Sequence, residues 1–197
     1  MKRISALAIS SLLALSIPTA YADECVRPDV YGYDDIGCLS EGLARVSKND
    51  QYGFIDTTGK VVIPLIYDDA WEWFSGGLTR VRKDGKVGII DKTGKVVITL
   101  IYDNAWWFIE GLALVKKNGK FGFVDKTGNV VAPLIYDGVR DFSEDLVKVE
   151  KNGKVGLIDK TGKVVVPPIY DYAYGFSEGL AEVGKNGKRG FIDKTGK

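Results

Sequence analysis

The stretch D-K-T-G-K-V-V at residues 91–97 decides the fold, because it returns unchanged at residues 159–165 and with small changes at three other places. A glycine three residues before it keeps a nearly fixed step of 35, 34, 34 and 34 residues, at Gly53, Gly88, Gly122, Gly156 and Gly190. A Tyr-Asp pair follows the same period, beginning at Tyr33-Asp34. Such a period indicates a tandem array in which each unit buries its apolar face against its neighbours.

Each unit reads as strands separated by turns. In the third unit, residues 112–117 and 121–125 are rich in β-formers and flank Asn118-Gly119, a strong hairpin signal. A second turn at residues 125–128 leads into a third strand that begins at Val130 and contains Pro133, so this strand is either interrupted or lies at a sheet edge. The sequence therefore predicts an all-β fold of five three-stranded antiparallel meanders of about 34 residues each.

The alternation along the first predicted strand of each unit indicates which side is packed. The side with small apolar residues is expected inside and the opposite side, whose charge changes between units, outside. The expected inner residues are Ala44, Val46, Thr79, Val81, Ala113, Val115, Val147, Val149, Ala181 and Val183. The expected outer residues are Arg45, Arg80, Leu114, Lys148 and Glu182. Recurring phenylalanines are expected to fill the space between units: Phe74, Phe108, Phe142 and Phe176.

The core G-[FIL]-[IV]-D-x-T-G-[KN]-V-V-x-P-x-I-Y-D, followed by F-S-E-G-L-A-x-V and N-G-K-x-G, resembles the WG-type (KWG-like) β-repeat family of bacteria. The resemblance covers residues 41–197, although the family's tryptophan before the glycine is replaced by Tyr52, Val87, Phe121, Val155 and Arg189. It implies a non-catalytic repeat scaffold, often exported.

Two arrangements of the units fit the sequence. The chain begins near a degenerate third strand (residues 28–34) and reaches the second strand of the last unit at residue 193, so one end could complete the other in a five-bladed, propeller-like ring. Each unit, however, is shorter than the about 40–45 residues of a WD-type blade. An open β-superhelix is therefore the first expectation, and the closed ring is the alternative.

The N-terminal residues indicate export. A basic head (Lys2 and Arg3), an uncharged, mostly apolar run and the A-x-A site ending at Ala22 predict a signal peptide over residues 1–22. Residues 23–40 then form a degenerate N-terminal cap, in which Cys25 and Cys38 are expected to form a disulfide in the periplasm or outside the cell. No segment is long enough for membrane insertion.

The composition excludes several kinds of chemistry. The formal net charge of +1 becomes −1 without Lys2 and Arg3, which argues against a nucleic-acid partner. The chain contains no histidine, so His-based catalysis is excluded, and we expect neither an enzyme nor a cofactor. The repeated aspartate of each D-x-T-G stretch could suggest calcium, but it fits a turn better because the remaining oxygen ligands are missing.

Aromatic residues gather in the variable segment after each Tyr-Asp pair. These candidate binding residues are Trp71, Trp73, Trp106, Trp107, Tyr172 and Tyr174, with Glu72 and Glu110 expected to flank them. Stacked units would align them along one edge, where they could anchor a protein partner or stack on sugar rings. The alternative is that they pack between the units. The sequence thus leaves two functions open, a scaffold for protein–protein interaction at the bacterial cell envelope and a carbohydrate or peptidoglycan binder.

Overall fold

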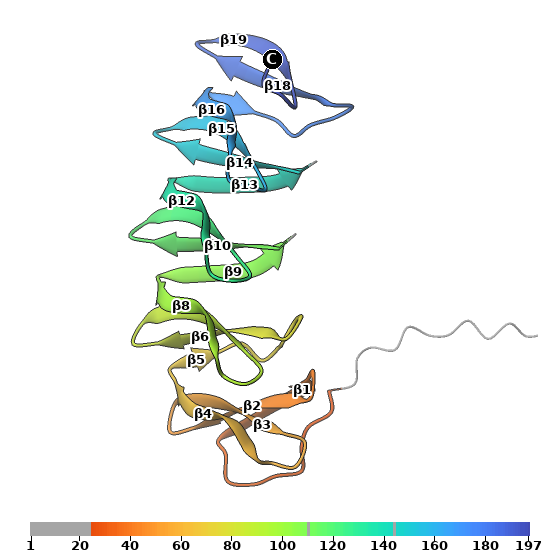
Figure 1. Ribbon diagram of the computed structural model, residues 1–197, viewed down its shortest axis with the longest axis vertical. Helices are drawn as coiled ribbons and strands as arrows, with labels where there is room; N and C mark the ends of the chain where they lie inside the picture. The colour runs from red at the N-terminus through yellow and green to blue at the C-terminus, as the bar shows by residue number, and fades with distance from the viewer. Residues whose placement is uncertain (1–24, 110, 144) are drawn as a thin grey trace, which may run out of the picture.

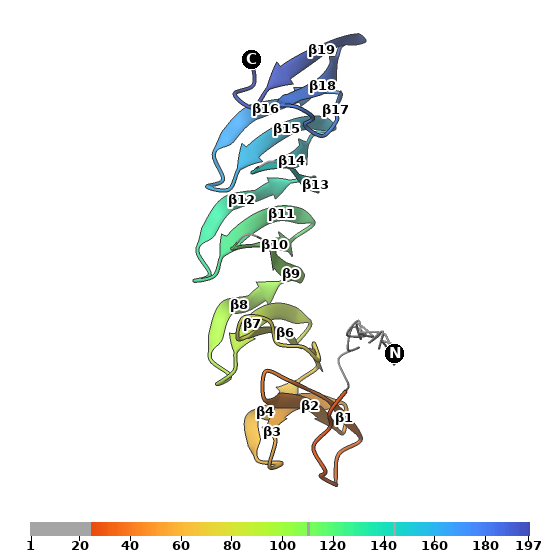
Figure 2. The same cartoon turned by 90° about the vertical axis from the view of Figure 1, so that its right-hand side faces the viewer.

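The protein is an elongated stack of small β-sheets (Figure 1). The computed structural model describes residues 25–197 except residues 110 and 144, and these residues form nineteen strands and no helix. The predicted signal peptide over residues 1–22 lies outside the described residues. The sheets follow one another along the long axis, so β1 (Asp35–Ser40) and β19 (Lys188–Asp193) lie at opposite ends (Figures 1 and 2).

Each sheet is built from strands that follow one another in the sequence. The first strands are β1 (Asp35–Ser40), β5 (Asp69–Ala70), β9 (Asn104–Ile109), β13 (Gly138–Ser143) and β17 (Tyr172–Ala173). The second strands are β2 (Leu43–Lys48), β6 (Leu78–Lys83), β10 (Leu112–Lys117), β14 (Leu146–Lys151) and β18 (Leu180–Lys185). The third strands are β3 (Gln51–Asp56), β7 (Lys86–Asp91), β11 (Lys120–Asp125), β15 (Lys154–Asp159) and β19 (Lys188–Asp193). The fourth strands are β4 (Val61–Tyr67), β8 (Val96–Tyr102), β12 (Val130–Tyr136) and β16 (Val164–Tyr170).

The all-β prediction is confirmed, but the prediction of three strands per unit is wrong. Within the described residues, four sheets have four antiparallel strands, and the last sheet has three, in the order β17-β18-β19. The unpredicted strand is the one that follows the Tyr-Asp pair. It joins the second strand through a tight turn in which Glu41 and Gly42, or Glu178 and Gly179, both have positive φ. A Glu-Gly turn is a weaker signal than Asn-Gly, so the sequence pattern did not reveal it.

Neighbouring sheets share their apolar cores. Phe54, Ile63 and Tyr67 of the first sheet form one cluster with Ala70, Phe74, Val81 and Ile90 of the second unit. Three further clusters join the later sheets in the same way. Each sheet is therefore covered on one face by the next sheet, so a unit taken alone would expose apolar residues.

The predicted inner residues are confirmed, whereas the predicted outer residues are not exposed. All ten inner residues are buried, among them Ala44, Thr79 and Val183. Arg80 is also buried, and Arg45, Leu114, Lys148 and Glu182 are partly buried. Both faces of an internal sheet pack against a neighbouring sheet. The second strand of such a sheet therefore has no side that is fully exposed to solvent.

The repeated aspartate is a turn residue, as predicted. The Oδ1 atom of Asp91 accepts hydrogen bonds from the Thr93 N–H (2.8 Å), the Thr93 hydroxyl (2.7 Å) and the Lys95 N–H (3.1 Å). Gly94 supplies the positive φ of 85° that closes the turn. The same three bonds recur at Asp56, Asp125, Asp159 and Asp193. In each turn, the Oδ1 atom of the aspartate thus accepts hydrogen bonds from two backbone N–H groups and one threonine hydroxyl.

Candidate functional site

The two tryptophans of the second unit lie in different environments. Both follow the short strand β5, in the segment that leads to β6. Trp71 is half-buried, and its backbone N–H donates to the Arg80 carbonyl at 2.9 Å. Trp73 is 55% exposed, because the next residue, Phe74, takes the inward position in the core. Of the two, Trp73 has the larger surface available for a partner.

Trp71 is held against a buried cation. The guanidinium carbon of Arg80 lies 5.3 Å from the centre of the Trp71 ring, within cation–π range. Arg80 also forms an ion pair with Asp69 at 3.4 Å and donates to the Asn104 side chain in the next sheet at 3.3 Å. Burial lowers the pKa of Arg80, while the carboxylate of Asp69 raises it. Arg80 nevertheless stays charged, because arginine does not lose its proton in proteins.

Trp106 of the third unit is also packed rather than free. Its ring lies 5.8 Å from the ring of Phe121, tilted by 33°, and its side chain is partly buried. Phe121 in turn lies below the Lys116 ammonium group, 5.0 Å away. Trp107 lies within β9, and its side chain lies outside the described part of the chain. Trp106 therefore contributes mainly to packing at the edge of its sheet.

The two tyrosines of the last unit form a pair. The rings of Tyr172 and Tyr174 are 5.3 Å apart, and the Tyr172 hydroxyl donates to Glu182 at 3.2 Å. Burial raises the pKa of Tyr172, and the hydrogen bond to Glu182 raises it further. Tyr174 is 62% exposed. Tyr174 resembles Trp73 in being an aromatic side chain that faces solvent.

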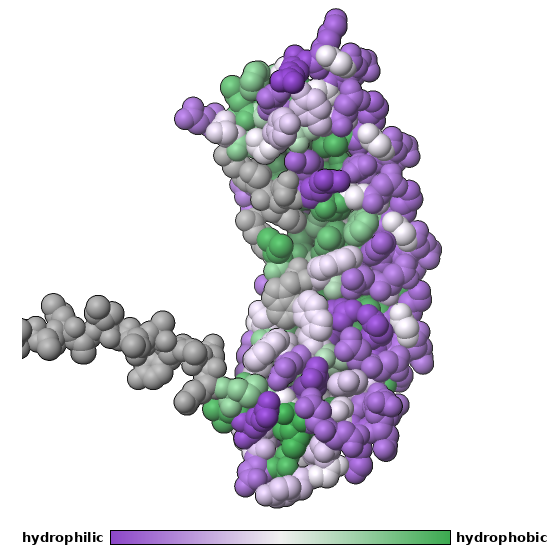
Figure 3. All heavy atoms as spheres, turned by 180° about the vertical axis from the view of Figure 1, so that it is seen from behind, coloured by the Kyte–Doolittle hydropathy of each residue, from purple (hydrophilic) through white to green (hydrophobic). Residues whose placement is uncertain are grey.

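The candidate aromatic residues lie in two parts of the array, and of the described ones only Tyr172 and Tyr174 are in ring contact with each other. Trp71, Trp73 and Trp106 belong to the second and third sheets, and Tyr172 and Tyr174 belong to the fifth. Between the groups lies the fourth sheet, which carries the exposed Arg140 on β13. Figure 3 shows hydrophilic residues densely along one side of the array and apolar residues mainly toward the opposite, hollowed side.

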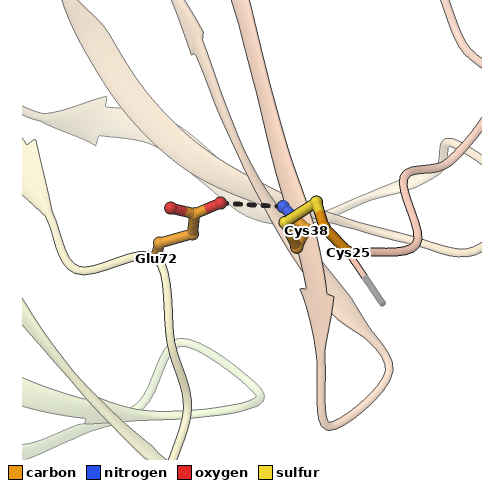
Figure 4. The surroundings of a disulfide bond; sticks show 3 residues. All are labelled: Cys25, Cys38 and Glu72. Atoms are coloured by element: carbon orange, nitrogen blue, oxygen red, sulfur yellow. Dashed lines mark hydrogen bonds between the residues drawn. A yellow bond between two sulfur atoms is a disulfide. The ribbon is translucent and has the colours of Figure 1, made fainter. Parts of the chain in front are cut away.

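Glu72, which was expected to flank the aromatic residues, makes a contact with the first unit. Its Oε1 atom accepts the backbone N–H of Cys38 at 2.8 Å and so ties the second unit to the first (Figure 4). Cys38 is joined to Cys25 by the predicted disulfide, which is confirmed. Glu110, the other expected flanking residue, lies outside the described residues. Glu72 is therefore a structural link between two sheets.

Several exposed apolar residues were not predicted as surface features. Ile109, at the end of β9, is 51% exposed. The fourth strands also expose a valine and an isoleucine in each unit: Val61, Ile66, Val96, Ile101, Val130, Ile135, Val164 and Ile169. The valine of the Gly-Lys-Val-Val motif and the isoleucine before Tyr-Asp are the signals that could have revealed them. Each fourth strand thus exposes two apolar side chains at the same positions of the repeat.

The repeated acidic residues take part in hydrogen bonds and ion pairs. In the described residues, no group of three or more acidic or cysteine side chains is placed to hold a metal ion. Hydrogen bonds from Thr93 hold the pKa of Asp91 below its usual value, and hydrogen bonding to Lys86 does the same for the pKa of Asp103. The described part of the chain also has no helix long and apolar enough to span a bilayer.

The repeat pattern has a counterpart among known families. The model of the WG containing repeat matches residues 32–52, 52–86, 88–121, 121–154 and 156–188. The chain belongs to the WG-repeat family. Four of the five matches begin near the third strand of a sheet, so each of these WG repeats spans parts of two neighbouring sheets. This offset agrees with cores that are shared between units.

Solved structures offer more distant likenesses to this WG-repeat array. A eukaryotic initiation factor is 17% identical with a TM-score of 0.45, over 86% of this chain and 55% of that one. Hsv2 of Kluyveromyces lactis is 10% identical with a TM-score of 0.40, over 79% and 58%. PorZ, a surface component of the type-IX secretion system of Porphyromonas gingivalis, is 12% identical with a TM-score of 0.34, over 84% and 26%. The WG-repeat chain thus spans little more than half of the first two proteins. No curated protein matches it in sequence.

Proposed function

We propose that the chain is an exported, non-catalytic scaffold that binds a protein partner at the bacterial cell envelope. The observation that carries this proposal is the exposure of Trp73 and Ile109 on corresponding segments of consecutive sheets, with more than half of each side chain open to solvent. Large apolar side chains of this kind are typical anchors of protein interfaces. Tyr174 provides a further anchor in the last sheet.

The contacts of the other aromatic residues favour a protein over a sugar. A sugar ring stacks on an open aromatic face, but the Trp71 ring is close to Arg80 and the Trp106 ring is close to Phe121. Anchors separated by packed residues suit a protein surface, which can contact them at several points along the array. Differences between units support the same assignment, because the turn residues repeat while the segments that carry the anchors differ.

The shape and the chemistry of the chain agree with a scaffold. An open superhelix is the arrangement that we infer for the array, and the separation of β1 and β19 in Figure 1 supports it over a closed ring. The absence of histidine from the sequence removes the commonest acid–base catalyst. The Cys25–Cys38 disulfide supports an oxidising location, such as the periplasm or the cell exterior.

Photo-crosslinking in the producing bacterium tests the proposal. A photoreactive phenylalanine analogue replaces Trp73 in one variant and the exposed turn residue Lys126 in a matched control. We expect a discrete crosslinked protein with the probe at residue 73 and a much weaker one with the probe at residue 126. Equal crosslinking at both positions, or at neither, would contradict a partner surface around Trp73.

The carbohydrate alternative has its own readout. Trp73 is open to solvent, so a bound glycan would change tryptophan emission in titrations with soluble peptidoglycan fragments. We expect no saturable change for the wild-type protein. A saturable change that disappears in Trp73→Ala would indicate that Trp73 binds a glycan rather than a protein.

A further inference from the structure

One fourth strand of the array lacks the proline that the other fourth strands carry. The strands β4, β12 and β16 have Pro64, Pro133 and Pro167 at the same position of the repeat, whereas β8 has Thr99. Proline at the edge of a sheet hinders the addition of a further strand, because it has no N–H group to donate. The edge of β8 therefore differs from the edges of the other fourth strands in its capacity to pair.

The N–H group of Thr99 is not needed inside its own sheet. β7 and β8 pair in the same register as β3 and β4, β11 and β12, and β15 and β16, where proline stands at this position. A register that forms three times with proline cannot depend on an N–H group there. The N–H group of Thr99 can therefore donate to a strand outside the sheet.

The outer edge of β8 is open to solvent. In the described residues, β8 is the last strand of its sheet and pairs with β7 alone. Thr99 is exposed, and Val96 and Ile101 are 45% and 40% exposed. Figure 2 shows β4, β8, β12 and β16 following one another along one side of the array. The sequence of β8, V-V-I-T-L-I-Y, carries no charge and is rich in β-branched residues, a composition that favours pairing with further strands.

The two ends of β8 carry opposite charges. Lys95 precedes the strand and Asp103 follows it, at equal distances in sequence from Thr99. When two copies of β8 lie antiparallel about Thr99, Lys95 of each copy therefore lies opposite Asp103 of the other. The same arrangement places Val97 of each copy opposite Ile101 of the other. The strand thus complements itself in charge and in apolar character.

We propose that β8 of one copy pairs with β8 of a second copy, antiparallel and centred on Thr99, so that the protein forms a symmetric dimer. The two Thr99 residues would exchange N–H···O=C hydrogen bonds and join the two sheets into one. A second copy is the occupant because the charges and apolar residues of β8 complement those of the same strand. The contact uses the same surface on both copies, so it closes at two copies. It leaves open the opposite edge of the sheet, where β5 and the segment that carries Trp73 lie.

The association is expected to be reversible. The next sheet covers part of the edge, since a Cβ atom on Gly128 would lie 2.7 Å from the Val97 carbonyl oxygen. The hydrogen bonds between copies are therefore concentrated around Thr99 rather than spread along the whole strand. A short contact of this kind dissociates on dilution, so the average mass in solution should rise with protein concentration.

Light scattering on the chain from residue 23 onward, with the disulfide formed, provides the first test. We expect the average mass to rise toward twice the monomer value with increasing concentration, and not beyond it. Thr99→Pro should keep the protein monomeric. This variant should melt at the same temperature as the wild-type monomer or higher, because three other units hold proline at this position. Thr99→Val is the matched control, since it removes the hydroxyl but keeps the N–H group and should still dimerise.

Three results of this experiment would overturn the proposal. The first is a wild-type protein that stays monomeric, or whose mass rises beyond that of a dimer. The second is a folded Thr99→Pro variant that associates like the wild type. The third is a monomeric Thr99→Val variant, because the hydroxyl rather than the backbone would then make the contact.

Disulfide cross-linking provides a second test that does not depend on the proline variant. Directly opposite residues of an antiparallel pair have Cα atoms about 4.5–5.5 Å apart, a separation that a disulfide can bridge. Thr99→Cys should therefore form an intermolecular disulfide rapidly under mild oxidation. Ile101→Cys is the matched control, because Ile101 is exposed on the same strand but would lie opposite Val97 rather than opposite its own counterpart. Equal cross-linking at the two positions, or none at residue 99, would overturn the assignment.

Discussion

Phe54 and Phe74 meet edge to face across the junction of the first two sheets, with ring centroids 5.0 Å apart. Both side chains are buried, and they belong to the same apolar cluster. Phe54 comes from a third strand and Phe74 from the segment that follows a first strand, so the contact depends on correct stacking of two units.

Phe54→Ala should lower the free energy of unfolding by about 3–5 kcal/mol, the usual cost of removing a fully buried aromatic ring. The same substitution at Phe191, its counterpart in the last sheet, should cost much less because that ring is mostly exposed. Urea denaturation followed by circular dichroism compares the two variants. Similar losses at both positions would contradict the different burial of these residues.

The turn aspartates should make stability depend on pH below about 4. Hydrogen bonds from threonine hold the pKa of Asp56, Asp91, Asp125, Asp159 and Asp193 below the ordinary value of 3.8. A lowered pKa in the folded state gives stability that is present above the unfolded pKa and is lost as the pH falls through the folded pKa. Urea midpoints should therefore change little from these groups between pH 7 and 5 and decrease toward pH 2.

A threonine variant isolates one of these turns. Thr93→Val removes the hydroxyl that donates to Asp91, the largest cause of its lowered pKa, and keeps the backbone N–H bond. The pKa of Asp91 should rise toward 3.8, while that of Asp159 should remain unchanged. NMR titration of the aspartate carboxyl carbons measures both values. An unchanged pKa at Asp91 would show that the Thr93 hydroxyl is not the main cause of the lowered pKa.

Removing the disulfide should destabilise the N-terminal end of the array. Cys25 and Cys38 close a loop with a sequence separation of 13 residues, for which the chain-entropy model gives about 3 kcal/mol. In Cys25→Ser/Cys38→Ser, amide hydrogen exchange should become faster in β1 and β2 and change little in β18. Uniformly faster exchange along the chain would mean that the whole array unfolds as a single unit.

Quenching of tryptophan fluorescence should distinguish Trp73 from the packed tryptophans. Trp73 is the exposed one among the described indole side chains, so acrylamide should quench it most readily. Trp73→Phe should remove this component and shift the remaining emission to shorter wavelength. Trp106→Phe is the matched control and should leave the quenchable component in place.

The sequence predicted the repeat, the turns and the inner face because each depends on local chemistry. Asn118-Gly119 adopts the positive φ angles that its residue types favour, and Asp125 closes its own turn. The first strand of each sheet was missed because its turn varies, with Glu41-Gly42 in the first unit and Gly76-Gly77 in the second, and because its aromatic residues do not alternate with polar ones. The burial of Arg80 was also missed, since alternation within a strand cannot show that a second sheet covers its other face.

The candidate site was predictable only as a list of residue types. The sequence located the aromatic residues in the variable segments, and Trp73 and Tyr174 are indeed exposed. It could not show that Arg80 lies beside Trp71, because that contact depends on pairing between two strands. It also could not assign Glu72 to the Cys38 N–H, which lies 34 residues earlier in the chain. Whether these residues bind a partner remains a prediction.

The self-contained turns have a consequence for how such chains change in length. Each D-x-T-G turn is closed by residues within four positions, and each core is formed with the adjacent unit alone. An internal block of 34 residues, such as 122–155, can therefore be deleted while the flanking sheets meet in the same register. We expect the shortened protein to fold cooperatively with a lower melting temperature, which calorimetry would show. Duplication or loss of whole 34-residue repeats would then change the length of the array by one sheet at a time.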